Sequence, residues 1–553
     1  MIQAMIERLH RAPVREHGLT LQRRIDLCRS CVESVLPTVD EWIRAGARAK
    51  GCPDRNDVLA EELLTGPLIA VRLLRLLGKS FSDLQQYGTP RLPDGSQNSI
   101  ERTLIRKPLL RIFPTHSLWD RVIFDRIRAD VVLMERTDPR KRHLALFGNL
   151  QNTAVCEISL VLGAGNVSSV PFSDAIHKSL VCGKQVILKM NPVNSYLKSI
   201  FEQAFEPLFK EGLLLAVEGD SQVGQALVDH PAIGDIHLTG SLPTHDRIVW
   251  GSDPEEVQLL KQRKTPRVNK PVTSELGNVS PWVVVPGIYS SAQLASQAKH
   301  IAASITNNVG FNCLATRVII TSRSWPQRHK FLKLIQNYLK QTPLRPSYYP
   351  GSIERYQRFA QSNTQPDDRG CLPWLLMEDQ SIENNPLVFQ EESFACVCVE
   401  TALDAPSPEW FLEEAVAFCN NRLAGTLCAS ITFPTPFHDR RLMNNALNTL
   451  NYGCVCVNQW SALAYSLLTP PWGGAPGATL EDARSGIGQV HNTYLLERVE
   501  KTILSGPLVN FPKPVWFQDH RNALAVGKEL IALYHNGKHK HLLKLMRHAL
   551  IGT

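Results

Sequence analysis

The first part of the chain carries apolar residues at helical spacing. After Gly66-Pro67 the apolar positions are Leu68, Val71, Leu73, Leu74, Leu76 and Leu77. Arg72 and Arg75 are interleaved with them. This spacing predicts a helix. We expect that helix to end at Gly78, because glycine often follows the last helical turn.

From about residue 144 the pattern changes to short apolar runs separated by helical stretches. The runs predict strands at 155–162, 185–188, 213–217 and 235–238. The stretches between them predict helices near 172–182, 195–211 and 219–229. Such alternation is typical of a parallel sheet covered by helices. The polar stretch at 252–272 interrupts the alternation and predicts an inserted loop.

A second set of strands and helices follows that loop. The predicted strands lie at 282–285, 318–320, 394–400, 426–433 and 454–458. Helices are predicted near 291–305 and 326–341, and the tail after residue 506 also has a helical pattern. The sequence therefore predicts an α/β protein with helical regions at both ends.

Composition excludes several classes of protein. The 553 residues are 43% hydrophobic and 20% charged, which excludes a wholly disordered chain, a coiled coil and a collagen-like fibre. The thirteen cysteines show no framework spacing, and the first residues contain no apolar signal core. No apolar run reaches the roughly 18 residues that a membrane-spanning helix needs. We therefore expect a cytoplasmic protein.

The net charge of +8 is concentrated at the two ends, in residues 1–130 and 506–553. The centre is nearly neutral, so no nucleic-acid partner is expected. The last helical stretch has Leu542, Met546 and Leu550 on one side. Such a helix usually docks on its own protein, and contact with a membrane surface is the alternative.

The sequence contains two clusters of residue types that can bind metal ions. Cys28-Arg29-Ser30-Cys31 is a single CxxC in a helical stretch, without the second pair that a zinc site uses. The histidines near the C-terminus stand among lysines without cysteine or carboxylate partners, which is typical of a solvated basic face. We therefore predict no metal site.

Five short segments carry the candidate chemistry. In chain order they are Gly165-Asn166-Val167, Ile187-Leu188-Lys189-Met190-Asn191-Pro192, Thr239-Gly240-Ser241, Ser274-Glu275-Leu276-Gly277-Asn278, and Asn308-Val309-Gly310-Phe311-Asn312-Cys313-Leu314-Ala315-Thr316-Arg317. Together and in this order, they resemble the aldehyde dehydrogenase superfamily over about residues 145–505. Glu391-Glu392-Ser393-Phe394 and Pro471-Trp472-Gly473-Gly474 resemble later motifs of that family.

The resemblance implies a catalytic trio. Cys313 would be the nucleophile, Glu275 the general base, and Asn166 a donor to the oxyanion. A thiol at its reference pKa of about 8.5 is only a few per cent ionised at pH 7, so a base or a favourable environment is required. The thiolate would form a thiohemiacetal and then a thioester, which water activated by Glu275 would hydrolyse.

The resemblance also implies NAD or NADP as cofactor. Lys189, Gly240 and Ser241 would bind its adenosine and phosphate groups, and Glu392 and Phe394 would hold the nicotinamide ribose. Pro192 replaces a residue whose side chain normally accepts from a ribose hydroxyl, so the choice between NAD and NADP is open. His245 replaces the second glycine of the phosphate loop, where a Cβ narrows the approach to a pyrophosphate.

The resemblance implies a domain plan and an assembly. The plan has a helical N-terminal region at 1–130, a Rossmann-type nucleotide-binding domain at 131–277, a catalytic α/β domain at 278–470, a return to the nucleotide-binding or oligomerisation region at 471–505, and a helical extension at 506–553. A homo-oligomer is expected. The basic ends are expected to be additions to the enzyme, outside its chemistry.

Three functions remain open from the sequence. The first is NAD(P)-dependent oxidation of an aldehyde to a carboxylic acid. The second is a CoA-dependent acyl reductase of the same superfamily, which the remodelled segment around Asn166 favours and Glu275 opposes. The third is a non-catalytic relative that binds a nucleotide, which Pro192 and His245 favour and the Cys313–Glu275 pair opposes.

Overall fold

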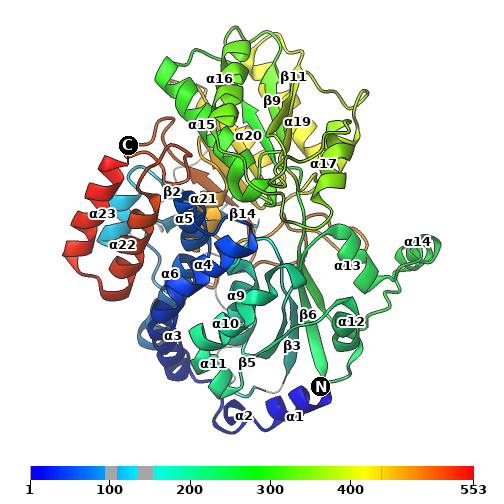
Figure 1. Ribbon diagram of the computed structural model, residues 1–553, viewed down its shortest axis with the longest axis vertical. Coiled ribbons are helices and arrows are strands. Elements are labelled where there is room, and N and C mark those ends of the chain that lie inside the picture. The colour runs from blue at the N-terminus through cyan, green and yellow to red at the C-terminus, as the bar shows by residue number, and fades with distance from the viewer. Residues whose placement is uncertain are drawn as a thin grey trace.

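The computed structural model describes residues 2–93, 107, 109–134, 153–155, 157–437 and 439–552. Two sheets, each with its own helices, stack along the long axis of the molecule, and helices from both ends of the chain lie beside them (Figure 1). The N-terminal helices are α1 (Ile2–His10), α2 (Pro13–His17), α3 (Leu21–Val35), α4 (Val39–Ala49), α5 (Asn56–Thr65) and α6 (Pro67–Tyr87).

The smaller sheet is entirely parallel, with the strand order β5-β4-β3-β6-β7. Its elements are β3 (Ile158–Leu162), α9 (Ser169–Ile176), β4 (Gln185–Lys189), α10 (Lys198–Ala204), α11 (Glu206–Glu211), β5 (Leu214–Val217), α12 (Ser221–Asp229), β6 (Ile233–Thr239), α13 (Leu242–Val249), α14 (Pro254–Arg263) and β7 (Val272–Glu275). Val186 and Leu188 of β4 pack into one core, which α3, α6 and α9 share. Ile187 between them faces a second core, shared with α1 and α12, because side chains alternate along a strand.

The larger sheet has the order β1-β2-β14-β13-β12-β8-β9-β11-β10 and is parallel except where β2 pairs with β1 and β14. Its elements are β1 (Leu109–Phe113), α7 (Leu118–Ile123), β2 (Arg128–Leu133), β8 (Pro281–Val284), α15 (Ser291–Thr306), β9 (Val318–Ser322), α16 (Arg328–Gln341), α17 (Ser352–Ala360), β10 (Leu375–Met377), α18 (Leu387–Gln390), β11 (Val397–Leu403), α19 (Pro408–Arg422), β12 (Cys428–Thr432), α20 (Arg440–Thr449), β13 (Cys454–Val457), α21 (Ala462–Leu467) and β14 (Val499–Ser505). The predicted α/β class, with a parallel sheet, a second α/β unit and helical ends, is confirmed.

The chain passes from the smaller sheet to the larger one between β7 and β8. The first segments of the larger sheet, β1 and β2, come from residues 109–133, and the strand that joins them to the rest is β14 at 499–505. Residues near both ends of the chain therefore complete the sheet that also contains the middle of the sequence. β14 therefore belongs to the same sheet as the strands of residues 278–470. The domain limits expected from the sequence stay a prediction.

The helices at the two ends pack on each other. The C-terminal helices α22 (Ala523–Asn536) and α23 (His539–Ile551) lie beside α5 and α6 (Figure 1). Leu545 and Ala549 of α23 are buried, whereas Leu543 and Leu550 are exposed. Within the described residues, no helix combines the length and the apolar character that crossing a membrane requires.

The helix α6 differs from its prediction at Gly78. It continues through this residue to Tyr87, and Gly88 then adopts the left-handed conformation that ends it. Gly78 lies where α6 crosses α3, and a Cβ added there would lie 3.3 Å from the Cβ of Cys28. The glycine is therefore explained by close helix packing and not by termination.

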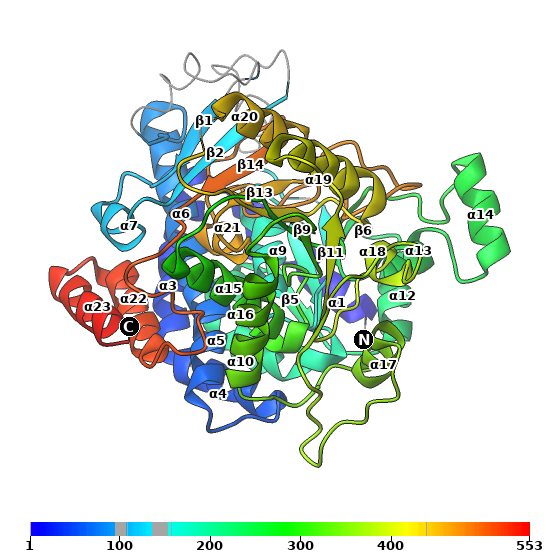
Figure 2. The ribbon, with the colours of Figure 1, turned by 90° about the horizontal axis from the view of Figure 1, so that it is seen from above.

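The stretch predicted as an inserted loop at 252–272 contains a helix. Asp253 caps α14 by accepting from the backbone N–H groups of Glu255 and Glu256, and Pro254 occupies the first turn. None of the residues of α14 is buried, and the helix projects from the body of the molecule (Figure 2). Only Val257 and Leu260 of this helix pack partly against the core, and so short a pattern does not predict a helix from the sequence.

Candidate active site

Glu275 and Cys313 come together although different sheets carry them. Glu275 is the last residue of β7, and Cys313 follows the short turn after α15. The Cys313 Sγ lies 3.8 Å from the Glu275 Oε1, and the Trp472 Nε1–H donates to the same oxygen at 2.9 Å. The thiol, the carboxyl group and the indole thus meet at one point.

Both groups sit where burial disfavours their charged forms. Burial, with the nearby Asp174 carboxylate, raises the pKa of Glu275 to about 8, and the hydrogen bonds from Trp472 and Cys313 offset part of this shift. Burial and the carboxyl groups of Glu275 and Glu392 raise the pKa of the Cys313 thiol well above its usual value. At neutral pH the pair is therefore a thiol beside a protonated carboxyl group.

Asn166 lines the same cavity as Cys313 and Glu275. Its Nδ2 donates to the backbone oxygen of Phe311 at 3.1 Å, and this bond ties it to the loop that carries Cys313. The backbone oxygen of Asn166 accepts from the Asn308 Nδ2 at 2.8 Å. The structure thus brings all three predicted catalytic residues to one place.

The loop before Cys313 has an unusual backbone. Asn308, Val309 and Gly310 all have positive φ, at 49°, 58° and 76°. A Cβ added at Gly310 would lie 2.5 Å from the backbone oxygen of Ala395, so only glycine fits there. A run of left-handed residues persists only where the surroundings hold it.

An ionic network from the N-terminal helices holds this loop. Glu61 accepts from the backbone N–H of Asn308 at 3.0 Å and from the Asn307 Nδ2 at 2.9 Å. The Lys50 Nζ donates to the Asn308 Oδ1 at 2.7 Å. Arg345 makes a two-pronged ion pair with Glu61, both contacts at 2.9 Å. Sequence reasoning missed these residues, because their pairings depend on the fold.

Breaking this network is expected to destabilise the protein. Arg345→Met leaves the buried Glu61 carboxylate without its main partner, and removing one member of a buried ion pair costs about 3–5 kcal/mol of folding free energy. The thermal unfolding midpoint measures the effect. The control is Lys528→Met, which removes an exposed pair with Asp40 at 2.9 Å and should cost about 1 kcal/mol or less. Equal midpoints for the two variants would contradict the role of the network.

Three predicted cofactor residues lie at the carboxyl edge of the smaller sheet. Lys189 ends β4, Gly240 and Ser241 follow β6, and β3 lies between these two strands. In parallel sheets this edge is where nucleotides bind. Ser241 caps α13 by accepting from the Thr244 N–H. Burial lowers the pKa of Lys189, which the Asp220 carboxylate partly offsets.

Glu392 and Phe394 lie on the other side of the site. The Glu392 Oε1 is buried and has no hydrogen-bond partner among the described residues. Burial raises the pKa of Glu392 to about 7, against the opposing effect of Arg317. A Cβ at Gly277 would lie 2.2 Å from the Glu392 Oε2, so this glycine lets Glu392 approach the segment that carries Glu275. Phe394 packs in an aromatic cluster with Phe311.

The His245 departure in the phosphate loop has a structural explanation. His245 is fully buried, and its Nδ1 lies 3.2 Å from the Asp246 Oδ1, so its side chain turns inward. Next to Asn166, a Cβ added at Gly165 would lie 2.6 Å from the Asn191 Oδ1, so close packing explains this glycine. Among the described residues, no group of three or more histidines, cysteines or carboxylates is arranged to hold a metal ion.

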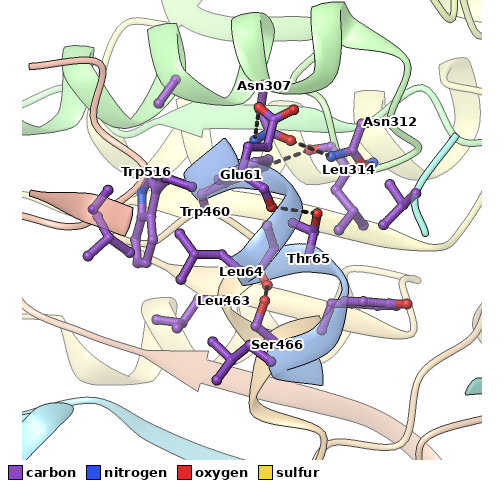
Figure 3. Close-up of a pocket in the computed structure, with 18 of the residues that line it drawn as sticks. Glu61, Leu64, Thr65, Asn307, Asn312, Leu314, Trp460, Leu463, Ser466 and Trp516 are labelled. Carbon is purple, nitrogen blue, oxygen red and sulfur yellow. Dashed lines mark hydrogen bonds between the residues drawn. The ribbon is translucent and has the colours of Figure 1, made fainter. Parts of the chain in front are cut away.

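A cavity of about 440 Å³ opens beside this site (Figure 3). Cys313, Glu275 and Asn166 lie on its wall, together with Trp460 and Leu463 from the region of α21. Residues of α5, α6 and α22 also line it. The ends of the chain, expected from the sequence to lie outside the chemistry, therefore enclose the space next to the candidate nucleophile.

Comparisons with known proteins find similar sequences over part of the chain. The model of the "Aldehyde dehydrogenase family" matches residues 160–353. The "4-trimethylaminobutyraldehyde dehydrogenase A" of Danio rerio is 29% identical over 189 residues, which are 33% of this chain and 32% of that protein. The matched region thus spans about a third of this relative's length.

Solved structures resemble nearly the whole chain. The NAD-dependent aldehyde dehydrogenase from Sinorhizobium meliloti has a TM-score of 0.58 at 15% identity, covering 93% of this chain and 86% of its own. The glyceraldehyde-3-phosphate dehydrogenase GapN from Methanocaldococcus jannaschii, complexed with NADP, has a TM-score of 0.56 at 15% identity, covering 91% and 94%. The chain therefore has the fold of these aldehyde dehydrogenase structures over nearly its whole length, and residues 160–353 match the model of the aldehyde dehydrogenase family.

Proposed function

We propose that this protein oxidises an aldehyde to the carboxylic acid, with NAD or NADP as the acceptor. The observation that supports this most directly is the Cys313 Sγ at 3.8 Å from the Glu275 carboxyl group, with Asn166 on the same cavity. A nucleophile, a base and a polar donor around one space are the parts that acyl chemistry requires.

The first half of the reaction forms a bond to sulfur. Ionised Glu275 takes the proton of the Cys313 thiol and later releases it to solvent, and Sγ adds to the carbonyl carbon. The resulting oxyanion accepts hydrogen bonds from the Asn166 Nδ2 and the Cys313 backbone N–H. NAD or NADP, when bound, accepts the hydride that leaves this carbon, and a thioester on Cys313 remains.

The second half consumes water. Glu275, again ionised, takes a proton from a water molecule whose oxygen adds to the thioester carbon. The C–S bond then breaks, and Cys313 recovers its proton. The position of Glu275 against Cys313 favours water as acyl acceptor over coenzyme A, since transfer to coenzyme A requires no water-activating base.

The residues present fit a nicotinamide cofactor. Ser241, at the first turn of α13, and Lys189, at the end of β4, would hold its phosphate and ribose groups. The buried Glu392 Oε1, which has no hydrogen-bond partner among the described residues and lies 3.9 Å from the Arg317 guanidinium, is an acceptor suited to a ribose hydroxyl. Lys189 has a positive charge that serves either NAD or NADP, so both belong in the test.

The experiment is a panel of aldehydes with each cofactor. Formation of reduced nicotinamide together with the free acid supports the proposal, and formation of acyl-coenzyme A only when coenzyme A is added would replace it with acyl transfer. Absence of turnover with every aldehyde, while NAD or NADP still binds in a calorimetric titration, would favour a nucleotide-binding protein without catalysis.

Asn166→Ala is expected to lower kcat by about 10²–10³-fold, the usual effect of removing one oxyanion donor. The KM for the cofactor should change little, since Asn166 lies with Cys313 on the cavity wall and is hydrogen-bonded to the Cys313 loop. Steady-state kinetics of the variant measure both values. Asn384→Ala, at an exposed position, is the matched control. A kcat that falls equally in both variants would contradict the assignment of Asn166.

A further inference from the structure

The cavity beside Cys313 is closed by helices from opposite ends of the chain. Leu64 belongs to α5, Leu68 and Ile69 to α6, and Trp516 and Leu530 to the C-terminal region. Figure 3 shows Leu64, Leu463 and Trp516 around the same space. Part of the cavity wall is therefore built from the two extensions.

Most of the surface of this cavity is apolar. The aliphatic and aromatic side chains on its wall include Leu64, Leu68, Leu314, Trp460, Leu463 and Trp516. Water in such a space has few polar partners, so replacing it with hydrocarbon is favourable.

Apart from Glu275, the charged residues on the cavity wall have partners of opposite charge. Glu61 is paired with Arg345 in the interior, and Arg55 with Asp57 nearer the surface. A third arginine, Arg72, forms an ion pair with Asp120 at 2.9 Å, and its Nε also donates to the backbone oxygen of Leu467.

The histidine on the wall, His520, also carries little charge at neutral pH. Burial lowers its pKa, and the nearby Lys513 lowers it further. A charged group on the substrate would therefore lose its hydration without meeting an opposite charge, which is costly.

We propose that the cavity selects aldehydes with a long, uncharged, apolar tail, which the N- and C-terminal helices enclose. The inference rests on the proposed oxidation at Cys313 and adds the class of substrate. It differs from what the matched relative's name states, since a trimethylamino group carries a fixed positive charge.

Each methylene that enters the cavity should raise kcat/KM about fourfold, the factor expected for burying one CH₂ group. A series from propanal to dodecanal should rise and then level when the tail fills the cavity. Aldehydes of matched length that end in a carboxylate or a trimethylammonium group should fall well below the uncharged series.

The decisive variant is Leu64→Trp, which narrows the cavity at the wall that α5 forms. We expect the ratio of kcat/KM for dodecanal to that for propanal to fall on the order of tenfold, because bulk in an apolar pocket discriminates by size. The matched control is Leu259→Trp on α14, where the leucine is exposed. The ratio of the two kcat/KM values does not change when part of the protein is inactive. Leu64→Ala is a second variant at the same site, which widens the cavity.

A binding measurement separates this inference from the proposed function. Calorimetric titration with propanol and dodecanol, which are not oxidised at Cys313, reports the tail site alone. Dodecanol binding that Leu64→Trp weakens supports the tail site even if every aldehyde remains unreacted, an outcome that overturns only the oxidation. Aldehyde turnover with no dependence on chain length, or a preference for the charged aldehydes, overturns the tail site and leaves the oxidation standing.

Discussion

Replacing Cys313 with alanine is expected to lower kcat for aldehyde oxidation on the order of 10⁴-fold or more. Without Sγ no thiohemiacetal forms, and the enzyme loses the step that turns one difficult reaction into two easier ones. Donors such as Asn166 remain in the variant, but they stabilise an oxyanion that no longer arises. Stopped-flow and steady-state assays of reduced nicotinamide measure the loss.

Two further results separate this loss from damage to the fold. Cys182→Ala removes another partly exposed thiol and should keep its activity. Mass spectrometry of the wild-type protein, quenched during turnover, should find the acyl group on the peptide that contains Cys313. Full steady-state activity in Cys313→Ala, or acylation at a different cysteine, would reject the nucleophile proposed here.

The local parts of the site could be predicted from the sequence because short segments define them. Glu275 ends a strand, and Gly310 precedes Cys313 at a point where any Cβ would meet the backbone of Ala395. Segments of this kind keep their order along the chain, so their residue types can be recognised without knowing how the sheets pack. Their meeting in space, with Sγ and carboxyl 3.8 Å apart, required the structure.

The long-range parts could not be predicted in this way. Lys50 and Glu61 meet Asn308 across about half of the sequence, and no periodic pattern marks such a contact. From the sequence, the basic ends are expected to be additions to the enzyme, because a sequence shows each charged residue without its partner in the fold. In the fold, Arg72 is neutralised by Asp120, and the apolar residues around it become a wall of the cavity.

The pKa of Glu275 gives the proposed reaction a characteristic pH dependence. Burial raises this pKa to about 8, so the carboxyl group is protonated and unable to act as a base below that pH. The hydrolysis of the thioester should therefore speed up about tenfold per pH unit as the pH rises towards 8, and level above it. At pH 6 only about 1% of the group is ionised, given that pKa.

Glu275→Gln should remove this dependence and lower the steady-state rate by about 10²–10⁴-fold, the usual contribution of a general base. A first-turnover burst of reduced nicotinamide should remain but form more slowly, because the thiol proton of Cys313 must then pass to solvent instead of to Glu275, whereas the hydrolysis loses its base altogether. Rapid-mixing kinetics across pH 6–9 measure both phases. Glu392→Gln is the matched variant: it replaces another buried carboxyl group with a raised pKa, and it should raise the KM for the cofactor while keeping the rise towards pH 8.

The pH dependence of the unfolding midpoint of Glu275→Gln is an independent test of the raised pKa of Glu275. A carboxyl group whose pKa is raised by folding contributes its stability fully below its unfolded pKa, near 4.5, and that contribution is lost as the pH rises through about 8. Glutamine cannot ionise, so the variant does not lose this contribution. As the pH rises between these values, the thermal unfolding midpoint of Glu275→Gln should therefore increase relative to that of the wild type. A constant difference between the two midpoints would show that Glu275 ionises normally in the folded protein, and the base proposed for the hydrolysis would then need no elevated pKa.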